Sequence, residues 1–347
     1  MAFPLTKIFV FEYLTGGGID PDIASTASLA DLSALIVEGR VMRDAIAADL
    51  RALPGIDVTV ASSRFEQIDD RYPHRRAQAG EAITHFVSRV AREHDYALVV
   101  APECDGLLLR FHDAVGTARW LGCGKEIIRM TSSKSATAAC LEAHGIAATP
   151  ALEPEQAASS RAMQWVVKPD DGAGGLDTYV YDDLDAALME YEARAAAGRN
   201  PVLQEWIHGE PLSLSIICND EGARLVSINR QCIGICNDAQ SDRRERIVQF
   251  DGVEADYIDR DSAQGRVLER LALRVADALP GLRGFTGIDV VWNEERGPVV
   301  IEVNPRLTVA YAEISKRRNL AAQLLAAHRV SGFEHDDTRL REHGAST

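Results

Sequence analysis

The sequence contains no long apolar run, and its acidic residues outnumber its basic ones. None of its apolar stretches approaches the roughly twenty residues that a helix needs to cross a bilayer. The formal net charge of −15 argues against a general nucleic-acid or membrane-surface binder, because phosphate backbones and anionic lipids attract basic surfaces. A bound nucleotide is compatible with this charge, since a local site with magnesium can hold a polyphosphate inside an acidic protein.

The sequence also lacks paired metal-binding cysteines and a secretory signal. Its six cysteines show no zinc spacing, and Cys232 and Cys236 lie in a strand-like segment where we expect buried thiols. The opening MAFPLTKIFVFEYL has no basic region, long apolar core or cleavage site. We therefore expect a soluble, cytoplasmic protein of a reducing compartment. Its expected partners are small-molecule substrates, with no nucleic acid and no membrane, and homo-oligomer formation is left open.

The first third of the chain alternates between strand and helix patterns. With 347 residues, 46% of them hydrophobic, the chain is long enough for two or three packed units. Strand and helix patterns alternate in the order 7–13, 29–53, 56–62, 80–94 and 97–102. This alternation predicts a parallel sheet with helices on both faces, whose ligands bind at the carboxyl ends of the strands.

A glycine-rich loop, LTGGG at residues 14–18, follows the first strand. It is not the G-x-G-x-x-G fingerprint and no helix opens on its third glycine, so an NAD site has weak support. Its role stays open between a flexible turn and a substrate-contacting loop. The stretch GCGKE at 122–126 lacks the spacing and the hydroxyl of a Walker A loop, so no such loop competes for phosphates.

From about residue 125 the pattern changes to short strands between turns, which is typical of an α+β unit. A helix capped at Ser132 or Ser133 and ended by Gly145 comes first. Short strands follow, interrupted by helices near 183–198 and 262–279. We place a domain boundary near residue 125 and expect a polar tail at the C-terminal end.

Two segments near the C-terminal end carry a candidate metal site. In VVIEVNPR, residues 299–306, the side-chain period of a strand puts Glu302, Asn304 and Arg306 on one face. In FTGIDVVW, Asp289 stands in a second apolar run, and the turn formers between the runs predict a hairpin. The hairpin would gather hard oxygen ligands suited to magnesium. The alternative is a solvated strand end.

A second group of residues suits a nucleotide. Lys168 ends the strand WVVKP immediately before DDGAGG, whose glycines let backbone N–H groups approach phosphate oxygens; the alternative is an ordinary hairpin with a surface lysine. The backbone at Trp206 and Ile207 would suit adenine, and Glu210 a ribose. The remaining candidates are Lys134 near a helix start, Glu205 at a strand end and Arg230 in SINRQ, which would pair with a carboxylate.

Taken in order, these motifs resemble the ATP-grasp superfamily of carboxylate–amine ligases over nearly the whole chain. The resemblance implies a Rossmann-like pre-ATP-grasp domain, a small lid subdomain, a large subdomain and a polar tail, placed at residues 1–125, 126–200, 201–334 and 335–347. It implies ATP and two magnesium ions as cofactors, with manganese as an alternative. The implied metal ligands are Asp289, Glu302 and Asn304. The implied ATP contacts are Lys134, Lys168, Gly172, Gly174, Gly175, Glu205, Trp206, Ile207 and Glu210.

The resemblance also implies a reaction, in which a substrate carboxylate is phosphorylated by ATP and an amine then displaces phosphate to give an amide. Lys168, Arg230 and Arg306 are the expected catalytic side chains. Gly287 stands where some relatives carry an arginine, so Arg306 or Arg230 is expected to supply that charge. The opening KIFVFEYLTGGG and SINRQ look more narrowly like the tyramine–L-glutamate ligases of methanofuran and methylofuran biosynthesis.

Two other functions are kept beside this one. The first is the same chemistry on another amino-acid or peptide pair. The second is a non-catalytic nucleotide-binding sensor, which would not need a complete metal set. The base that deprotonates the amine, the oligomeric state and the identity of both substrates are not predicted from the sequence.

Overall fold

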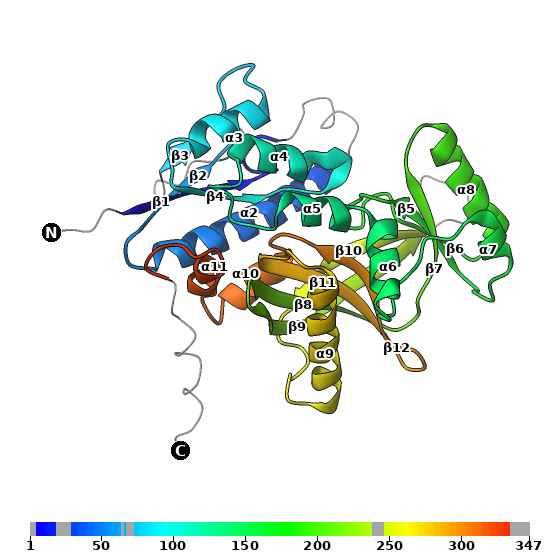
Figure 1. Ribbon diagram of the computed structural model, residues 1–347. Helices are drawn as coiled ribbons and strands as arrows, with labels where there is room; N and C mark the ends of the chain where they lie inside the picture. Colours follow the sequence, from blue (N-terminus) through cyan, green and yellow to red (C-terminus); the bar gives the residue numbers. More distant parts are fainter. Residues whose placement is uncertain (1–4, 19–28, 64–65, 67–72, 238–245, 334–347) are drawn as a thin grey trace.

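The computed structural model describes residues 5–18, 29–63, 66, 73–237 and 246–333. The expected polar tail at 335–347 lies outside the described residues. One parallel and one antiparallel sheet organise the described part of the chain (Figure 1). The expected fold class, α/β followed by α+β, is confirmed.

The first sheet is parallel, in the order β3-β2-β1-β4. Alternate side chains of β1 face opposite ways, so that Phe9 and Phe11 pack against α3 and α4, whereas Ile8 and Val10 pack against α2. Helices therefore cover both faces, as the strand and helix pattern predicts. The elements are β1 (Thr6–Glu12), α2 (Leu29–Arg51), β2 (Ile56–Ala61), β3 (His74–Arg75), α3 (Ile83–Ala91), β4 (Tyr96–Val100), the 3₁₀ turn η1 (Cys104–Gly106) and α4 (Leu107–Val115).

The second sheet is antiparallel, with eight strands in the order β12-β11-β8-β9-β10-β6-β5-β7. Its strands are β5 (Trp165–Pro169), β6 (Tyr179–Tyr181), β7 (Pro201–Glu205), β8 (Glu210–Asn219), β9 (Gly222–Asn237), β10 (Arg246–Glu254), β11 (Gly284–Asn293) and β12 (Gly297–Asn304). Among the described residues, the group β5, β6 and β7 joins the larger group where β6 pairs with β10, at Val180 with Arg246 and Tyr179 with Ile247. The small group is on the right of Figure 1.

The helices of the second part are α5 (Lys125–Ser132), α6 (Lys134–Ala143), α7 (Pro154–Ala158), α8 (Leu184–Ala196), α9 (Ala263–Ala278), α10 (Val309–Ser315) and α11 (Ala321–Ala327). The expected capped helix is α6, where the Ser133 hydroxyl accepts the Ala136 N–H at 3.1 Å and Gly145, at a φ of 66°, follows the last turn. The sequence reading missed α4, α5, α10 and α11. These helices have seven to nine residues, too few to show a clear apolar period.

Two further findings concern the surface. The expectation that Cys232 and Cys236 are buried is wrong, because both thiols are exposed. Beyond Arg230, β9 pairs with β10 and with no other strand among the described residues, whereas β10 also pairs with β6 on its other edge. In the described ranges, no helix is both long and apolar enough to span a bilayer. The domain boundaries near 125, 200 and 334 stay predictions.

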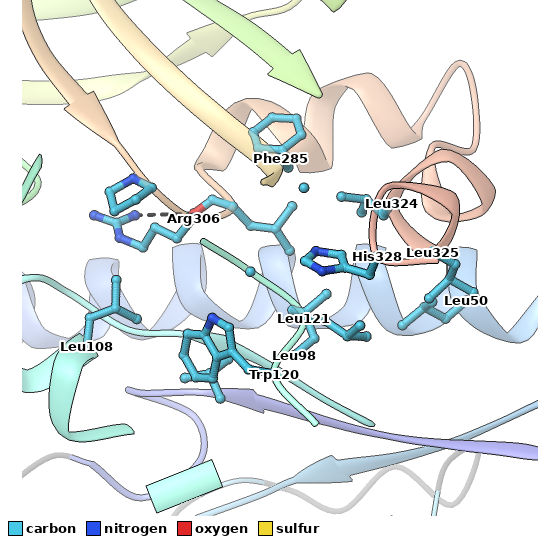
Figure 2. A pocket seen from close by; sticks show the side chains of 15 residues that line it. Leu50, Leu98, Leu108, Trp120, Leu121, Phe285, Arg306, Leu324, Leu325 and His328 are labelled. Atoms are coloured by element: carbon cyan, nitrogen blue, oxygen red, sulfur yellow. Dashed lines mark hydrogen bonds between the residues drawn. The ribbon is translucent and has the colours of Figure 1, made fainter. Parts of the chain in front are cut away.

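An apolar interface joins the parallel sheet to the larger group of the antiparallel sheet. Leu98, Phe285 and Leu324 belong to one core that includes α2, α10 and α11. Figure 2 shows His328, at the end of α11, pointing into a small cavity among these leucines, with Arg306 on its rim. The cavity volume is about 20 Å³, which is room for one water molecule.

Acidification is expected to destabilise the protein through His328. Burial, and then the charge of Arg283, lowers the pKa of His328 from 6.5 to about 4. Above pH 6.5, the pKa of the unfolded chain, the imidazole is neutral in both the folded and the unfolded state. Below it, the unfolded chain binds a proton, whereas the folded chain binds one only near a pH of about 4. Stability is therefore lost as the pH falls through this window, by about 2 kcal/mol at a pH of about 5.

Denaturant unfolding at neutral and mildly acidic pH measures this effect. His328→Leu should flatten the dependence of the unfolding free energy on pH across this window. His85→Leu is the control, since His85 is exposed to solvent, and it should keep the wild-type dependence. Equal slopes for His328→Leu and the wild type would show that His328 is not the group responsible.

Candidate active site

The predicted hairpin of β11 and β12 is confirmed, and it brings the candidate metal ligands together. Asp289 lies directly opposite Glu302, with a register shift at the next residue. The Asn304 amide donates to Asp289 Oδ2 at 3.1 Å. The Gln231 amide, from β9, donates to Asp289 Oδ1 at 3.0 Å, so both oxygens of this carboxylate have a fixed orientation.

Two buried lysines face this acidic pair. Lys134 Nζ lies 3.2 Å from Glu302 Oε2 and also donates to the Gly172 carbonyl. Burial opposes ionisation of Glu302, but the charges of Lys134 and Lys168 outweigh it and lower the Glu302 pKa to about 2. Burial and the neighbouring charge of Lys134 lower the Lys168 pKa to about 8. Cations from the start of α6 and from β5 are thus held against the acidic hairpin of β11 and β12.

The donor set fits a hard divalent cation. Burial, and then the charge of Glu302, raises the Asp289 pKa well above its usual value, and a bound cation would offset this repulsion. Within the described ranges, no cluster of three His, Cys, Asp or Glu side chains has metal-binding geometry, so a metal bound here would need the Asn304 amide oxygen beside the two carboxylates. Oxygen ligands of this kind suit magnesium.

The glycine-rich segment after β5 is tied to the start of α6. The Asp170 carboxylate accepts the Ser133 hydroxyl at 2.7 Å and the Ser135 N–H at 2.8 Å, and the Asp170 carbonyl accepts the Lys134 N–H at 3.0 Å. Gly174 and Gly175 have φ angles of 66° and 73°, which side chains disfavour. The start of α6 and the first residues of the glycine-rich segment are therefore held together.

The candidate adenine and ribose contacts lie at the turn between β7 and β8. The Trp206 N–H donates to the Gln164 carbonyl at 3.0 Å. The Glu205 carboxylate accepts the Ser160 hydroxyl and Arg296, so its side chain is already engaged. Glu210 accepts the exposed Tyr257 hydroxyl. The contacts of Trp206, Ile207, Glu205 and Glu210 with a nucleotide stay predictions.

The two candidate arginines lie in different surroundings. Arg306 is buried, and its Nη2 donates to Glu103 Oε2 at 2.9 Å across the junction with the parallel sheet. Arg230 is exposed and lies over the Tyr257 ring at 5.3 Å. The alternation of β9 puts it on the face opposite Gln231, away from Asp289. A β-carbon on Gly287 would come within 2.8 Å of Thr308, so no arginine fits at that position.

The loop at residues 14–18 is a hydrogen-bonded turn. The buried Glu12 carboxylate accepts the Leu14 N–H at 3.1 Å, the Thr15 N–H at 2.8 Å and the Thr15 hydroxyl at 2.7 Å. Burial raises the pKa of Glu12 despite these bonds. A β-carbon on Gly39 of α2 would come within 2.5 Å of Glu12 Oε2, so only glycine allows this approach. Substrate contact by this loop stays a prediction.

Three residues of the site were missed from the sequence, namely Gln231, Asp170 and Glu103. Gln231 is adjacent to Arg230, and the sequence analysis selected only the charged residue of this pair. Asp170 was visible within DDGAGG, where only the glycines were considered. Glu103 follows β4, at the carboxyl end of a parallel strand, and the rule that ligands bind at such ends would have found it.

Comparison with known protein families matches this geometry. Residues 131–310 match the ATP-grasp domain family, and residues 58–128 match the pre ATP-grasp 3 domain. The first match covers more than half of the 347 residues, and the chain therefore belongs to the ATP-grasp family. Members of this family generally use ATP with magnesium. The chain is an ATP-dependent carboxylate–amine ligase.

Two sequence relatives carry one name, tyramine–L-glutamate ligase. The protein from Methanocaldococcus jannaschii is 28% identical over 336 residues, which cover 92% of this chain and 91% of the relative. The protein from Methanocaldococcus fervens is 27% identical over 233 residues, 67% of this chain and 65% of the relative.

Two solved structures share the fold. L-Amino acid ligase from Bacillus licheniformis has a TM-score of 0.61 at 14% identity, covering 94% of this chain and 75% of that one. D-Alanine–D-alanine ligase from Bacillus anthracis has a TM-score of 0.60 at 15% identity, covering 93% and 95%. At these identities, the likeness shows the fold alone.

The two carboxylates are expected to respond oppositely to neutralisation in metal-free protein. Glu302→Gln leaves Lys134 and Lys168 without their counter-charge and should cost about 3 kcal/mol of unfolding free energy. Asp289→Asn removes a repelling charge and should leave stability unchanged or raised. Denaturant unfolding with a chelator present measures both. Equal destabilisation by the two substitutions would contradict the charge arrangement described here.

Proposed function

We propose that this ligase joins the γ-carboxylate of L-glutamate to the amine of tyramine, forming an amide through an acyl phosphate. The observation that supports these substrates is the similarity to the Methanocaldococcus jannaschii protein, which covers 91% of that relative. The sequence resemblance adds a place in methylofuran or methanofuran biosynthesis. The chemistry rests on the cluster of Asp289, Glu302, Lys134 and Arg306.

The acidic pair and Asn304 would hold magnesium, which would neutralise the charge that develops during phosphoryl transfer. The fit rests on the two adjacent, partly buried carboxylates of Asp289 and Glu302. We assign two ions to the site, as the family resemblance implies. Gln231 would keep Asp289 oriented, since it donates to the carboxylate oxygen that Asn304 does not contact.

The side chains of this protein would position and neutralise the reacting groups. Lys134 and Lys168 would bind phosphate oxygens, because both are buried cations beside glycines that leave the backbone accessible. Arg306 would stabilise the negative oxygen that forms as the amine attacks the acyl phosphate. The segment around Gly174 and Gly175 would cover the phosphates and keep water from hydrolysing the intermediate.

The nucleotide base and sugar would lie at the turn after β7. Since the Trp206 N–H is already bonded to Gln164, adenine would pair with the Trp206 carbonyl and the Ile207 N–H. Glu210 would exchange its bond from Tyr257 for bonds from the ribose hydroxyls. Arg230, near Glu210 and exposed, would contact a substrate carboxylate only from outside the acidic cluster.

ADP release by the purified protein with magnesium and ATP tests the proposal. L-Glutamate alone, tyramine alone and the two together are compared, with mass spectrometry of the products. We expect ADP matched by γ-glutamyltyramine only when both substrates are present. ADP release with a different acid and amine from a wider panel would keep the ligase and reject these substrates. ATP binding without turnover on the whole panel would indicate a sensor.

Glu302→Gln is expected to lower turnover by about a thousandfold or more, because it removes one of the two charges that hold the metal. The matched control is Glu126→Gln, since Glu126 is exposed on α5 and should keep wild-type turnover. Steady-state ADP release measures both variants. Turnover of Glu302→Gln within about tenfold of the control would rule out Glu302 as a metal ligand.

A further inference from the structure

One carboxylate oxygen beside the active site is buried without a partner. Glu103 is 5% exposed, and its Oε2 accepts Arg306 Nη2 at 2.9 Å. Its Oε1 has no hydrogen-bond partner in the described part of the chain, and neither does Arg306 Nε. A buried charged oxygen without a donor is costly and rare in folded proteins. The pair therefore offers one unfilled acceptor and one unfilled donor to a ligand.

Glu103 occupies the place in the parallel sheet where ligands bind. From β1 the chain proceeds outward through β2 and β3, and it then returns to β4 on the other side of β1. The crevice at such a reversal, at the carboxyl ends of the strands, is the usual ligand site of an open parallel sheet. Glu103 follows β4 on one side of this crevice, and the hydrogen-bonded turn at 14–18 follows β1 on the other.

The other acidic side chains of this region are already engaged. Asp289 accepts Gln231 and Asn304, and Glu302 pairs with Lys134. The carboxylates of Glu12, Asp170 and Asp171 accept backbone N–H groups. Among these acids, Glu103 is the one whose unpartnered oxygen is buried, and this oxygen is available to a cationic group of a substrate.

The glycine-rich segment lies against the turn that carries Glu103. The Asp105 N–H, in a residue with a φ of 52°, donates to Asp171 Oδ2 at 2.6 Å. The Cys104 thiol lies within hydrogen-bonding distance of the Ala173 N–H. This contact covers η1 and explains how Glu103 is buried in a crevice. A substrate would reach Glu103 before these contacts form.

We propose that Glu103 Oε1 binds a primary ammonium group of a substrate. This group would lie next to the substrate carboxylate whose acyl phosphate Arg306 would stabilise. The proposal rests on the ligase function proposed above. A carboxylate oxygen accepts an ammonium N–H as a charge-assisted bond, and the Arg306 pair fixes its direction. Two substrates carry such a group, because the acceptor amine and the α-amino group of L-glutamate are both ammonium ions in solution. No bond is formed or broken at Glu103.

The test compares wild type, Glu103→Gln and the exposed control Glu126→Gln by ADP release of the full chain. Glutamine keeps an oxygen for Arg306 but removes the charge. We expect the KM for one ammonium substrate to rise by about 10- to 100-fold in Glu103→Gln, with the KM for ATP unchanged. A higher KM for tyramine, or for the amine that the panel identifies in its place, would show that Glu103 binds the acceptor amine. A higher KM for L-glutamate would show that Glu103 binds its α-ammonium group.

Hydroxylamine, which is uncharged near neutral pH, separates this role from a structural one. As the nucleophile with glutarate as the acid, it gives a reaction without any ammonium group, and Glu103→Gln should form hydroxamate as fast as the wild type. Equal loss of this reaction, or unchanged KM values for both ammonium substrates, would overturn the proposal. Absence of ADP release by the wild type with every acid and amine would instead reject the ligase function itself.

If Glu103→Gln does not fold, affinity measurements on the wild type test the proposal. Its affinity for tyramine is compared with that for 4-ethylphenol, and its affinity for L-glutamate with that for glutarate, by competition in the same assay. One of the two ammonium compounds should bind about tenfold or more tightly than its uncharged analogue. Near-equal affinities in both comparisons would overturn the proposal.

Discussion

The candidate active site depends on the attraction between two buried lysines and two partly buried carboxylates that belong to different parts of the chain. Lys134 and Lys168 come from the elements around the glycine-rich segment, whereas Asp289 and Glu302 come from one hairpin of the larger group. Neither set is stable alone in a buried place, because an unpaired buried charge is strongly unfavourable. The charges therefore hold these parts of the chain against one another, and the adjacent carboxylates of Asp289 and Glu302 offer oxygen ligands suited to a metal ion.

The parts of the fold that follow from local patterns were predictable from the sequence. The βαβ alternation predicts the first sheet, and the run from Asp289 to Glu302 predicts a hairpin, because turn formers separate two apolar strands. The short helices α4, α5, α10 and α11 were not predictable in this way. Contacts between residues distant in sequence were also missed, since Glu103 and Arg306 are 203 residues apart and only the folded chain places them together.

The same limit applies to roles within the site. The residue types and their order were enough to show a resemblance to a family of ligases. They did not show which side chains have unfilled hydrogen bonds. Arg230 and Arg306 were equally suitable as charges in the sequence. The structure separates them, because one lies on an exposed face of β9 and the other is buried against Glu103. Burial and strand face are tertiary properties, and no local pattern determines them.

The join between β6 and β10 has a mechanical consequence. The small group of strands shares only two residue pairs with the rest of its sheet among the described residues, at Val180 with Arg246 and at Tyr179 with Ile247. A join this narrow resists twisting far less than the long pairing of β8 with β9 does. We therefore expect any rotation of the small group to occur about this line, while its own three strands stay paired. We also expect Lys168, on β5, to move with the small group, whereas Asp289, Glu302 and Asn304 stay with the broadly paired strands.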